Sequence, residues 1–196
     1  MIRRPQTSHL NESAPKLFLS LGTLISLPQN GETMTDEFGD LQKIRSVGDY
    51  QFGKGFGQKL FPSAVEITYS KRTRRIRYVF LNQDRLVTLR PTDGLFSLTV
   101  MGAERLMEKT GCLRLCVMVK EEAVPFIAKG RSVFAKHVIE ASGEIRPQEE
   151  VIVIDGKSAV LAVGRAMLSG KEMKTFKKGV AVRVRRGSAE KTREAI

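Results

Sequence analysis

The side chains best suited to chemistry in this chain are cations, and they are densest at one point. Five of them lie within seven residues: Lys71, Arg72, Arg74, Arg75 and Arg77. Such a group repels itself unless a polyanion relieves the charge, and the next acid along the chain is Asp84. Contact with phosphate groups is therefore the favoured interpretation. The alternative is a solvated cluster that keeps the edges of neighbouring strands apart.

The composition of the whole chain agrees with an anionic partner. The 33 Lys and Arg residues outnumber 21 Asp and Glu residues, which gives a net charge of +12 and an isoelectric point near 10.0. A nucleic acid is the leading partner for such a protein, and a basic protein without such a partner is the alternative. No apolar run is long enough to span a bilayer as a helix, so we expect no membrane partner and a cytoplasmic location.

Residues that could hold a metal or perform catalysis are few and scattered. Cys112 and Cys116 have no second cysteine pair, and His9 and His137 are distant from them in sequence. Two cysteines cannot complete a zinc site, so Cys116 is predicted to be a core thiol. The remaining candidates, the loop acids Asp49 and Asp93, are explained as turn or cap formers. The sequence thus predicts no catalytic residue, no metal site and no cofactor.

The first half of the chain has the pattern of a small helix-and-strand unit. Apolar residues from Leu41 to Phe52 follow helical spacing. Glycines at 53, 55 and 57 then predict a mobile loop in which Lys54 can approach another chain. Alternating apolar residues predict antiparallel strands at 65–69 and 76–80, joined by the cationic hairpin. Two more strands around Pro91 and a helix at 101–109, stopped by Gly111, complete this unit.

The second half begins with a predicted strand at 113–119 and a short helix after Glu121, ended by Gly130. A strand at 133–139 follows, in which Phe134 could face either the core or a partner, and the core is the favoured interpretation. The stretch VLAVGRAMLSGKEMKTFKKGVAVRVRR (160–186) predicts a strand with a bulge or close backbone approach at Gly164. A capped helix beginning at Ser169, with Met173 and Phe176 on one face, ends at Gly179. The last strand alternates valines with Ala181, Arg183 and Arg185, so one face is buried and one is basic.

These motifs resemble a known RNA-binding family. The stretch 160–186, with EEAVPFIAKGRSVFAKHV (121–138) and EIRPQEEVIVID (144–155), resembles the PUA domain, most closely that of archaeosine tRNA-guanine transglycosylases. DYQFGKGFGQKLFP, VEITYSKRTRRIRYV and TLRPTDGLFSLTVMGAERL resemble the C2-type domain that precedes it. The resemblance implies an α+β protein, with a small antiparallel α/β domain at 41–111 and a PUA pseudo-barrel at 112–187. Residues 1–40 are expected to be disordered or extended, or a non-native extension if translation begins at Met34, and 188–196 to be a tail.

The PUA resemblance also implies an RNA-facing side, formed by the helix-to-strand element and the strand that carries Gly164. On that side the predicted contacts are Lys129, Arg131, Ser132, Lys136, Gly164 and Arg165, and Arg183 of the basic strand face joins them. One departure is Gln148-Glu149, where the family often has Gly-Asp, so the turn at that point is expected to differ.

The resemblance implies a function without catalysis. The catalytic barrel of the transglycosylases, with its aspartate nucleophile and zinc site, has no counterpart among these residues. The chain is therefore expected to bind tRNA at the acceptor stem, as a non-catalytic subunit or accessory factor of archaeosine-type base modification. Its partner would be a separately encoded catalytic chain. The alternative is a ribosome-associated translation factor with a similar pre-PUA and PUA arrangement.

Overall fold

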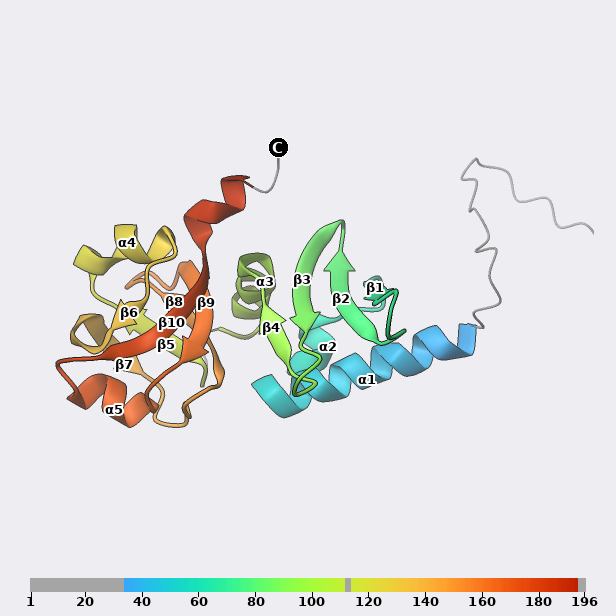
Figure 1. Cartoon of the computed structure of the whole chain (residues 1–196), viewed down its shortest axis with the longest axis horizontal. Helices are drawn as coiled ribbons and strands as arrows, with labels where there is room; N and C mark the ends of the chain where they lie inside the picture. The colour runs from blue at the N-terminus through green and yellow to red at the C-terminus, as the bar shows by residue number, and fades with distance from the viewer. Residues whose placement is uncertain (1–33, 112–113, 194–196) are drawn as a thin grey trace, which may run out of the picture. The chain divides into compact units, whose positions relative to one another are not determined.

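The computed structural model describes residues 34–111 and 114–193 of the chain (Figure 1). The first half contains helix α1 and helix α2, four strands, and helix α3. Their bounds are α1 Met34–Phe52, α2 Phe56–Leu60, β1 Glu66–Tyr69, β2 Ile76–Leu81, β3 Asp84–Leu89, β4 Phe96–Leu98 and α3 Val100–Thr110. The strands form one antiparallel sheet in the order β1-β2-β3-β4.

One face of this sheet packs against the three helices. Ile44, Phe52 and Leu60 from the helices are buried with Val79, Val87 and Phe96 from the strands. The spacing of Ile44 and Phe52 is the helical spacing that the sequence predicts, so the first helix is confirmed. Thr99 caps α3 by accepting a hydrogen bond from Gly102 N at 3.0 Å, and Gly111 ends it with a positive φ of 76°.

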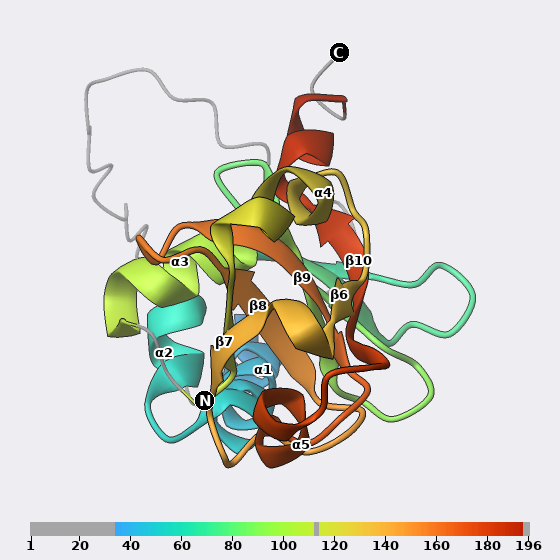
Figure 2. The ribbon, with the colours of Figure 1, turned by 90° about the vertical axis from the view of Figure 1, so that its left-hand side faces the viewer.

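The second half contains six strands around short helices (Figure 2). Their bounds are β5 Cys116–Val119, η1 Glu121–Ala123, α4 Val124–Ala128, β6 Val133–Phe134, η2 Ala135–His137, β7 Val138–Ala141, β8 Glu150–Ile154, β9 Val160–Ala166, α5 Gly170–Thr175, β10 Val180–Gly187 and η3 Ser188–Arg193. The strand order is β6-β10-β9-β8-β5-β7, and only β5 and β8 pair in parallel. Helices α4 and α5 lie at opposite ends of this barrel-like sheet.

The two halves share buried side chains and one ion pair whose acid is buried. Cys116, Ile152 and Val163 of the second sheet belong to the same apolar cluster as Phe96 of the first, so Cys116 is a core thiol as predicted. Glu150 is 2% exposed and pairs with both terminal nitrogens, Nη1 and Nη2, of the Arg185 guanidinium. The same two side chains hydrogen-bond to the backbone of Leu98, whose N–H donates to Glu150 at 2.8 Å and whose carbonyl accepts from Arg185 at 2.8 Å.

Several sequence predictions about element bounds are wrong. Helix α1 begins at Met34, so residues 34–40 belong to the fold, and Tyr69 Oη donates to Asp40 there at 2.8 Å. The predicted strand 133–139 is interrupted by η2. Helix α5 has the predicted capping box of Ser169 and Glu172 but ends at Thr175, because Phe176 already has an extended ψ of 137°.

One prediction about a shared helix face is also wrong. Met173 is buried while Phe176 is 45% exposed, so they do not share a buried face. On β10, Arg185 is exposed as predicted, but it also pairs with the buried Glu150. Residues 188–193 of the predicted tail form η3, in which Glu190 forms an ion pair with Arg186 at 3.7 Å. The predictions for residues 1–33, Cys112 and Leu113 lie outside the described residues.

Candidate nucleic-acid interface

Three adjacent strands carry the predicted RNA-facing cations of the second domain. Arg183 on β10 is directly opposite Arg165 on β9, so the two side chains project from the same face of the sheet. Arg131 and Ser132 immediately precede β6, whose Val133 pairs with Val182, the neighbour of Arg183. Arg183 and Arg131 are exposed, and Arg165 donates to the Gln148 side chain at 3.4 Å. Arg183 and Arg165 therefore form a basic line across β10 and β9, and Arg131 and Ser132 lie just before the neighbouring edge strand β6.

Gly164 positions this line and is itself buried. It pairs with Val184, and a Cβ at this position would overlap the carbonyl oxygen of Arg183. The predicted close backbone approach is therefore confirmed. Because the glycine is buried, we assign it to the spacing of β9 and β10, not to direct contact with RNA.

An aromatic pocket lies at one end of the basic line. Phe126 on α4 is 62% exposed and Phe134 on β6 is 48% exposed, and both line a pocket of about 550 Å³. The sequence prediction that places Phe134 in the core is wrong, because η2 interrupts the strand and β6 is only two residues long at the sheet edge. Arg131 and Ser132 line the same pocket.

Two more predicted contacts flank this pocket. Lys129 follows α4 at its C-terminal cap, and Lys136 lies in η2 between Ala135 and His137. Both lysines are exposed. His137 Nδ1 lies 3.1 Å from a carboxylate oxygen of Glu122 at the rim. We name Phe126, Lys129, Arg131, Ser132, Phe134 and Lys136 the aromatic-basic edge.

The cationic hairpin between β1 and β2 is a separate group. Lys71, Arg72, Arg74 and Arg75 are exposed, and no ion pair joins them to an acid among residues 34–111 and 114–193. Backbone hydrogen bonds hold the tip, with Ser70 N donating to Arg75 O at 2.9 Å and Arg74 N donating to Ser70 O at 2.8 Å. β1 is the sheet edge opposite to β4, the strand that contacts β8. The structure therefore does not bring the hairpin cations together with the aromatic-basic edge.

Arg77 differs from the other hairpin cations because it is held on its own strand. Its Nε donates to Tyr78 Oη at 3.0 Å, and its guanidinium lies 5.3 Å from the centre of that ring. Arg85 lies over the same ring at 5.5 Å. The hydrogen bond from Arg77, with the two nearby positive charges, lowers the pKa of Tyr78 from its usual value. Arg77 thus has less freedom to reach a phosphate than the tip residues.

The glycine loop before α2 exposes Lys54, as predicted. Gly53 and Gly55 have φ values of 126° and 82°. Asp49 caps the end of this loop by accepting from Gly57 N at 2.7 Å, and Asp93 accepts from Leu95 N at 3.0 Å. Both acids are therefore the cap and turn formers that the sequence predicts.

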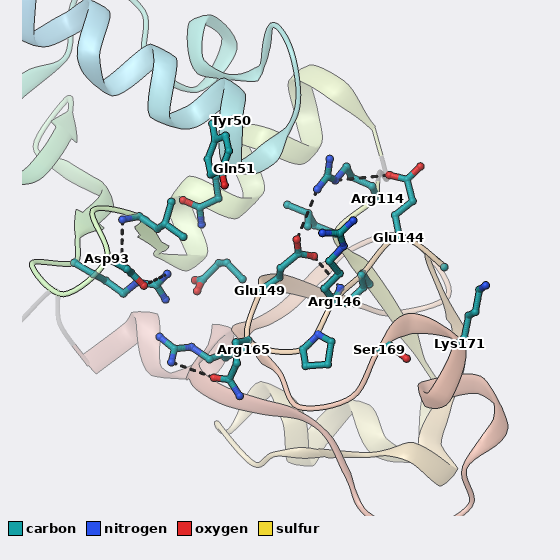
Figure 3. Close-up of a pocket in the computed structure, with 18 residues that line it drawn as sticks. Tyr50, Gln51, Asp93, Arg114, Glu144, Arg146, Glu149, Arg165, Ser169 and Lys171 are labelled. Carbon is teal, nitrogen blue, oxygen red and sulfur yellow. Dashed lines mark hydrogen bonds and ion pairs between the residues drawn. The ribbon is translucent and has the colours of Figure 1, made fainter.

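A cleft between the two halves contains residues that the sequence prediction missed. It has a volume of about 800 Å³ and is lined by Tyr50 from α1, by the turn after β3, and by residues 143–150 (Figure 3). Arg90, Arg114, Arg146 and Lys171 line it, none of which the sequence prediction selects. Tyr50 could have been selected, because it lies off the helical stripe of Ile44 and Val47. Nothing in the sequence brings Arg90 together with Arg146.

Two further searches of the described residues bear on function. Residues 34–111 and 114–193 contain no group of three or more His, Cys, Asp or Glu side chains placed to hold a metal ion. No helix in that part of the chain is long and apolar enough to cross a membrane.

Comparisons with known domain families and proteins agree with this architecture. Residues 42–111 match the patch-forming domain C2 of tRNA-guanine transglycosylase, and residues 116–188 match the PUA domain. The tRNA-guanine(15) transglycosylase of Methanothermobacter thermautotrophicus is 40% identical over 156 residues, which are 80% of this chain and 23% of the enzyme. That of Pyrococcus furiosus is 42% identical over 148 residues, which are 76% of this chain and 25% of the enzyme. The chain thus spans about a quarter of the length of these curated relatives.

Two solved structures match this chain over nearly the whole of their own length. A hypothetical protein of Pyrococcus horikoshii has a TM-score of 0.64 at 26% identity, with coverage of 80% of this chain and 94% of that one. A conserved PUA domain protein from Thermoplasma acidophilum has a TM-score of 0.59 at 19% identity, with coverage of 81% and 95%, which shows a common fold. The resemblance inferred from the sequence is confirmed. Residues 42–188 of this chain are a transglycosylase-type C2 domain followed by a PUA domain.

Proposed function

We propose that this protein binds tRNA at the acceptor end and serves, without catalysis of its own, a separately encoded tRNA-guanine transglycosylase. The observation that carries the proposal is the aromatic-basic edge. Two exposed phenylalanines line one pocket with Arg131, between Lys129 and Lys136. Aromatic rings stack on unpaired bases and cations neutralise phosphates, so this edge suits a single-stranded terminus.

The cationic hairpin provides the second contact. Its four tip cations are exposed and carry no base-reading pocket, so they suit the phosphates of a duplex stem. The basic line of Arg165 and Arg183 continues from the aromatic-basic edge along the sheet. A paired stem with an unpaired end presents both kinds of target in one molecule, which is the architecture of a tRNA acceptor arm.

The non-catalytic role is supported by the extent of the match. The two matched domains correspond to about a quarter of the named transglycosylases. The match to two solved proteins covers 94% and 95% of their own length. In a base-exchange assay on tRNA, we expect no exchange from this chain alone and a higher rate when it is added to a catalytic transglycosylase. Exchange by the chain alone would contradict the non-catalytic role.

The deciding binding measurement uses bulk tRNA at two salt concentrations beside tRNA trimmed at its 3′ end. Tight binding that falls with salt and with trimming supports the proposal, because phosphate contacts give the salt dependence and the unpaired end gives the loss on trimming. Ribosomal fractions serve as the parallel bait. Binding to ribosomal subunits without binding to free tRNA would instead indicate a translation factor.

A further inference from the structure

The cleft between the two domains has no role in the function proposed above. Its walls come from α1, from the turn between β3 and β4, and from the loop before β8. Figure 3 shows Tyr50 and Gln51 on one side and Arg146, Glu149 and Arg165 on the other. At about 800 Å³ it has the size of a small-ligand site.

Two guanidinium groups in this cleft have buried N–H groups without an acceptor in the described residues. Arg90 bonds to Asp93 through Nε at 3.0 Å and Nη2 at 2.8 Å, but its buried Nη1 has no hydrogen-bond partner there. Arg114 reaches Glu144 and Glu149 only at 3.8 Å, and its buried Nε is also without a partner. These N–H groups are themselves buried, whereas Arg146 is exposed and forms no ion pair with an acid among residues 34–111 and 114–193, so Arg146 is the cation that can meet a phosphate oxygen in this cleft.

The cleft also contains a stacking surface and hydrogen-bond acceptors. The Tyr50 side chain is 80% exposed at the last turn of α1. Glu144 reaches Arg114 only at 3.8 Å, so its carboxylate can accept hydrogen bonds from the N–H groups of a base edge. One oxygen of Glu149 accepts from Arg146 N at 2.9 Å, and its other oxygen lies 3.8 Å from Arg114 and can take the same role. The same carboxylates repel the continuous phosphate backbone of a duplex. The mixture of acids, arginines and an exposed ring therefore favours one unpaired nucleotide over a paired stem.

We infer that this cleft binds a single unpaired nucleotide of the RNA, away from its 3′ end. The base stacks on Tyr50 and its N–H edge faces Glu144 or Glu149, while the phosphate meets Arg146 and Arg165. The inference rests on the proposed RNA-binding function and adds a second point at which the RNA must be single-stranded. Arg165 belongs to both the cleft and the basic line, so it connects the two contacts.

The test is photo-crosslinking with benzoylphenylalanine placed at one position at a time in the full chain. Position 50 probes the cleft, and position 134 probes the aromatic-basic edge. Position 38 is the matched control, because Phe38 is an exposed aromatic residue on the same helix, 67% exposed, and does not line the cleft. We expect position 134 to label the 3′ end of tRNA, position 50 to label one internal unpaired nucleotide, and position 38 to label neither.

The outcomes separate this inference from the proposed function. Labelling at 134 without labelling at 50 overturns the cleft site and leaves RNA binding intact. Labelling at neither position overturns both. Labelling at 50 spread evenly over paired nucleotides also overturns the inference, because it indicates a general phosphate surface.

An affinity measurement completes the test. Tyr50→Ala should weaken tRNA binding at least about five-fold through lost stacking, and Tyr50→Phe should retain the parent affinity because the ring remains. Phe38→Ala is the control and should have no effect. Equal affinities for Tyr50→Ala and the parent would overturn the stacking role.

Discussion

The cationic hairpin and strand β10 carry similar runs of charge but use them differently. At the hairpin tip, Lys71 to Arg75 are exposed and unpaired with any described acid. On β10, Arg183 is exposed, Arg185 is exposed but pairs with the buried Glu150, and Arg186 pairs with Glu190. A run of arginines therefore does not by itself indicate an RNA contact. The available acids decide which cations remain free for a phosphate.

The largest effect on stability should come from breaking the ion pair between Arg185 on β10 and Glu150. Glu150→Ala leaves the Leu98 N–H without its acceptor and removes the ion pair with Arg185, which should lower the free energy of unfolding by roughly 2 kcal/mol. Urea denaturation followed by circular dichroism measures this. Glu144→Ala is the control, since the Glu144 side chain is 71% exposed and its ion pair with Arg114 is 3.8 Å long. A loss below about 1 kcal/mol for Glu150→Ala would mean that Arg185 is not structural.

Reversing the charge of the hairpin tip should weaken RNA binding and leave folding unchanged. Changing Lys71, Arg72, Arg74 and Arg75 to Glu should weaken tRNA binding roughly 100-fold at low salt, because several phosphate contacts are lost. The slope of log affinity against log salt should fall by about 0.9 for each contact. Titrations at several salt concentrations measure both. If the affinity does not change, the hairpin is only a solubilising surface.

The exposed phenylalanine at the aromatic-basic edge should have a smaller but more selective effect. Phe134→Ala should reduce the affinity for tRNA with an intact 3′ end by about 1 kcal/mol, and the affinity for trimmed tRNA should hardly change. Competition between the two RNAs measures the preference. Ile139→Ala is the matched control, because Ile139 is a 53% exposed apolar residue on β7 that does not line the aromatic pocket. An equal loss for both RNAs would remove the edge as a specificity element.

The smallest effect concerns how the hairpin strand is anchored to α1. Burial alone would raise the pKa of Asp40, but hydrogen bonds from Lys43 and Tyr69 outweigh it, so the pKa lies below its usual value of 3.8. The stabilisation is therefore present above that pH and is lost as the pH falls through the lowered pKa. Asp40→Asn should cost less than about 1 kcal/mol at neutral pH. Thermal melts across pH 2–7 should show the difference from the parent disappearing in strong acid.

Most of the fold could be predicted because local patterns determine it. The capping box of Ser169 and the stops at Gly111 and Gly130 each depend on neighbours within a few residues. The alternation at 76–80 predicts strand β2 in the same way, although the buried residue of that strand is Val79. The errors arise where distant partners override such a pattern. Arg185 has the spacing of an exposed residue and is exposed, yet it pairs with Glu150, 35 residues earlier, which no local pattern indicates.

The candidate site could be predicted only in part, for the same reason. Hairpin cations are adjacent in sequence, so their shared location follows from a turn. The cleft brings together Tyr50, Arg90 and Arg146, which no periodicity connects. The sequence favours the core for Phe134, whereas the position of β6 at a sheet edge, which exposes this ring, is a tertiary property.

The hydrogen bonds of Glu150 and Arg185 to Leu98 have a consequence for which lengths of RNA the protein can bind. Because Leu98 at the end of β4 is held through both its N–H and its carbonyl, we expect the hairpin and the aromatic-basic edge to stay at a fixed distance from each other. Two individually weak contacts on such a body reinforce each other only when the RNA presents its two targets at the matching span. Avidity of this kind commonly adds 10²- to 10⁴-fold. An RNA with the right bases but a lengthened stem would then reach only one of the two contacts, the hairpin or the aromatic-basic edge.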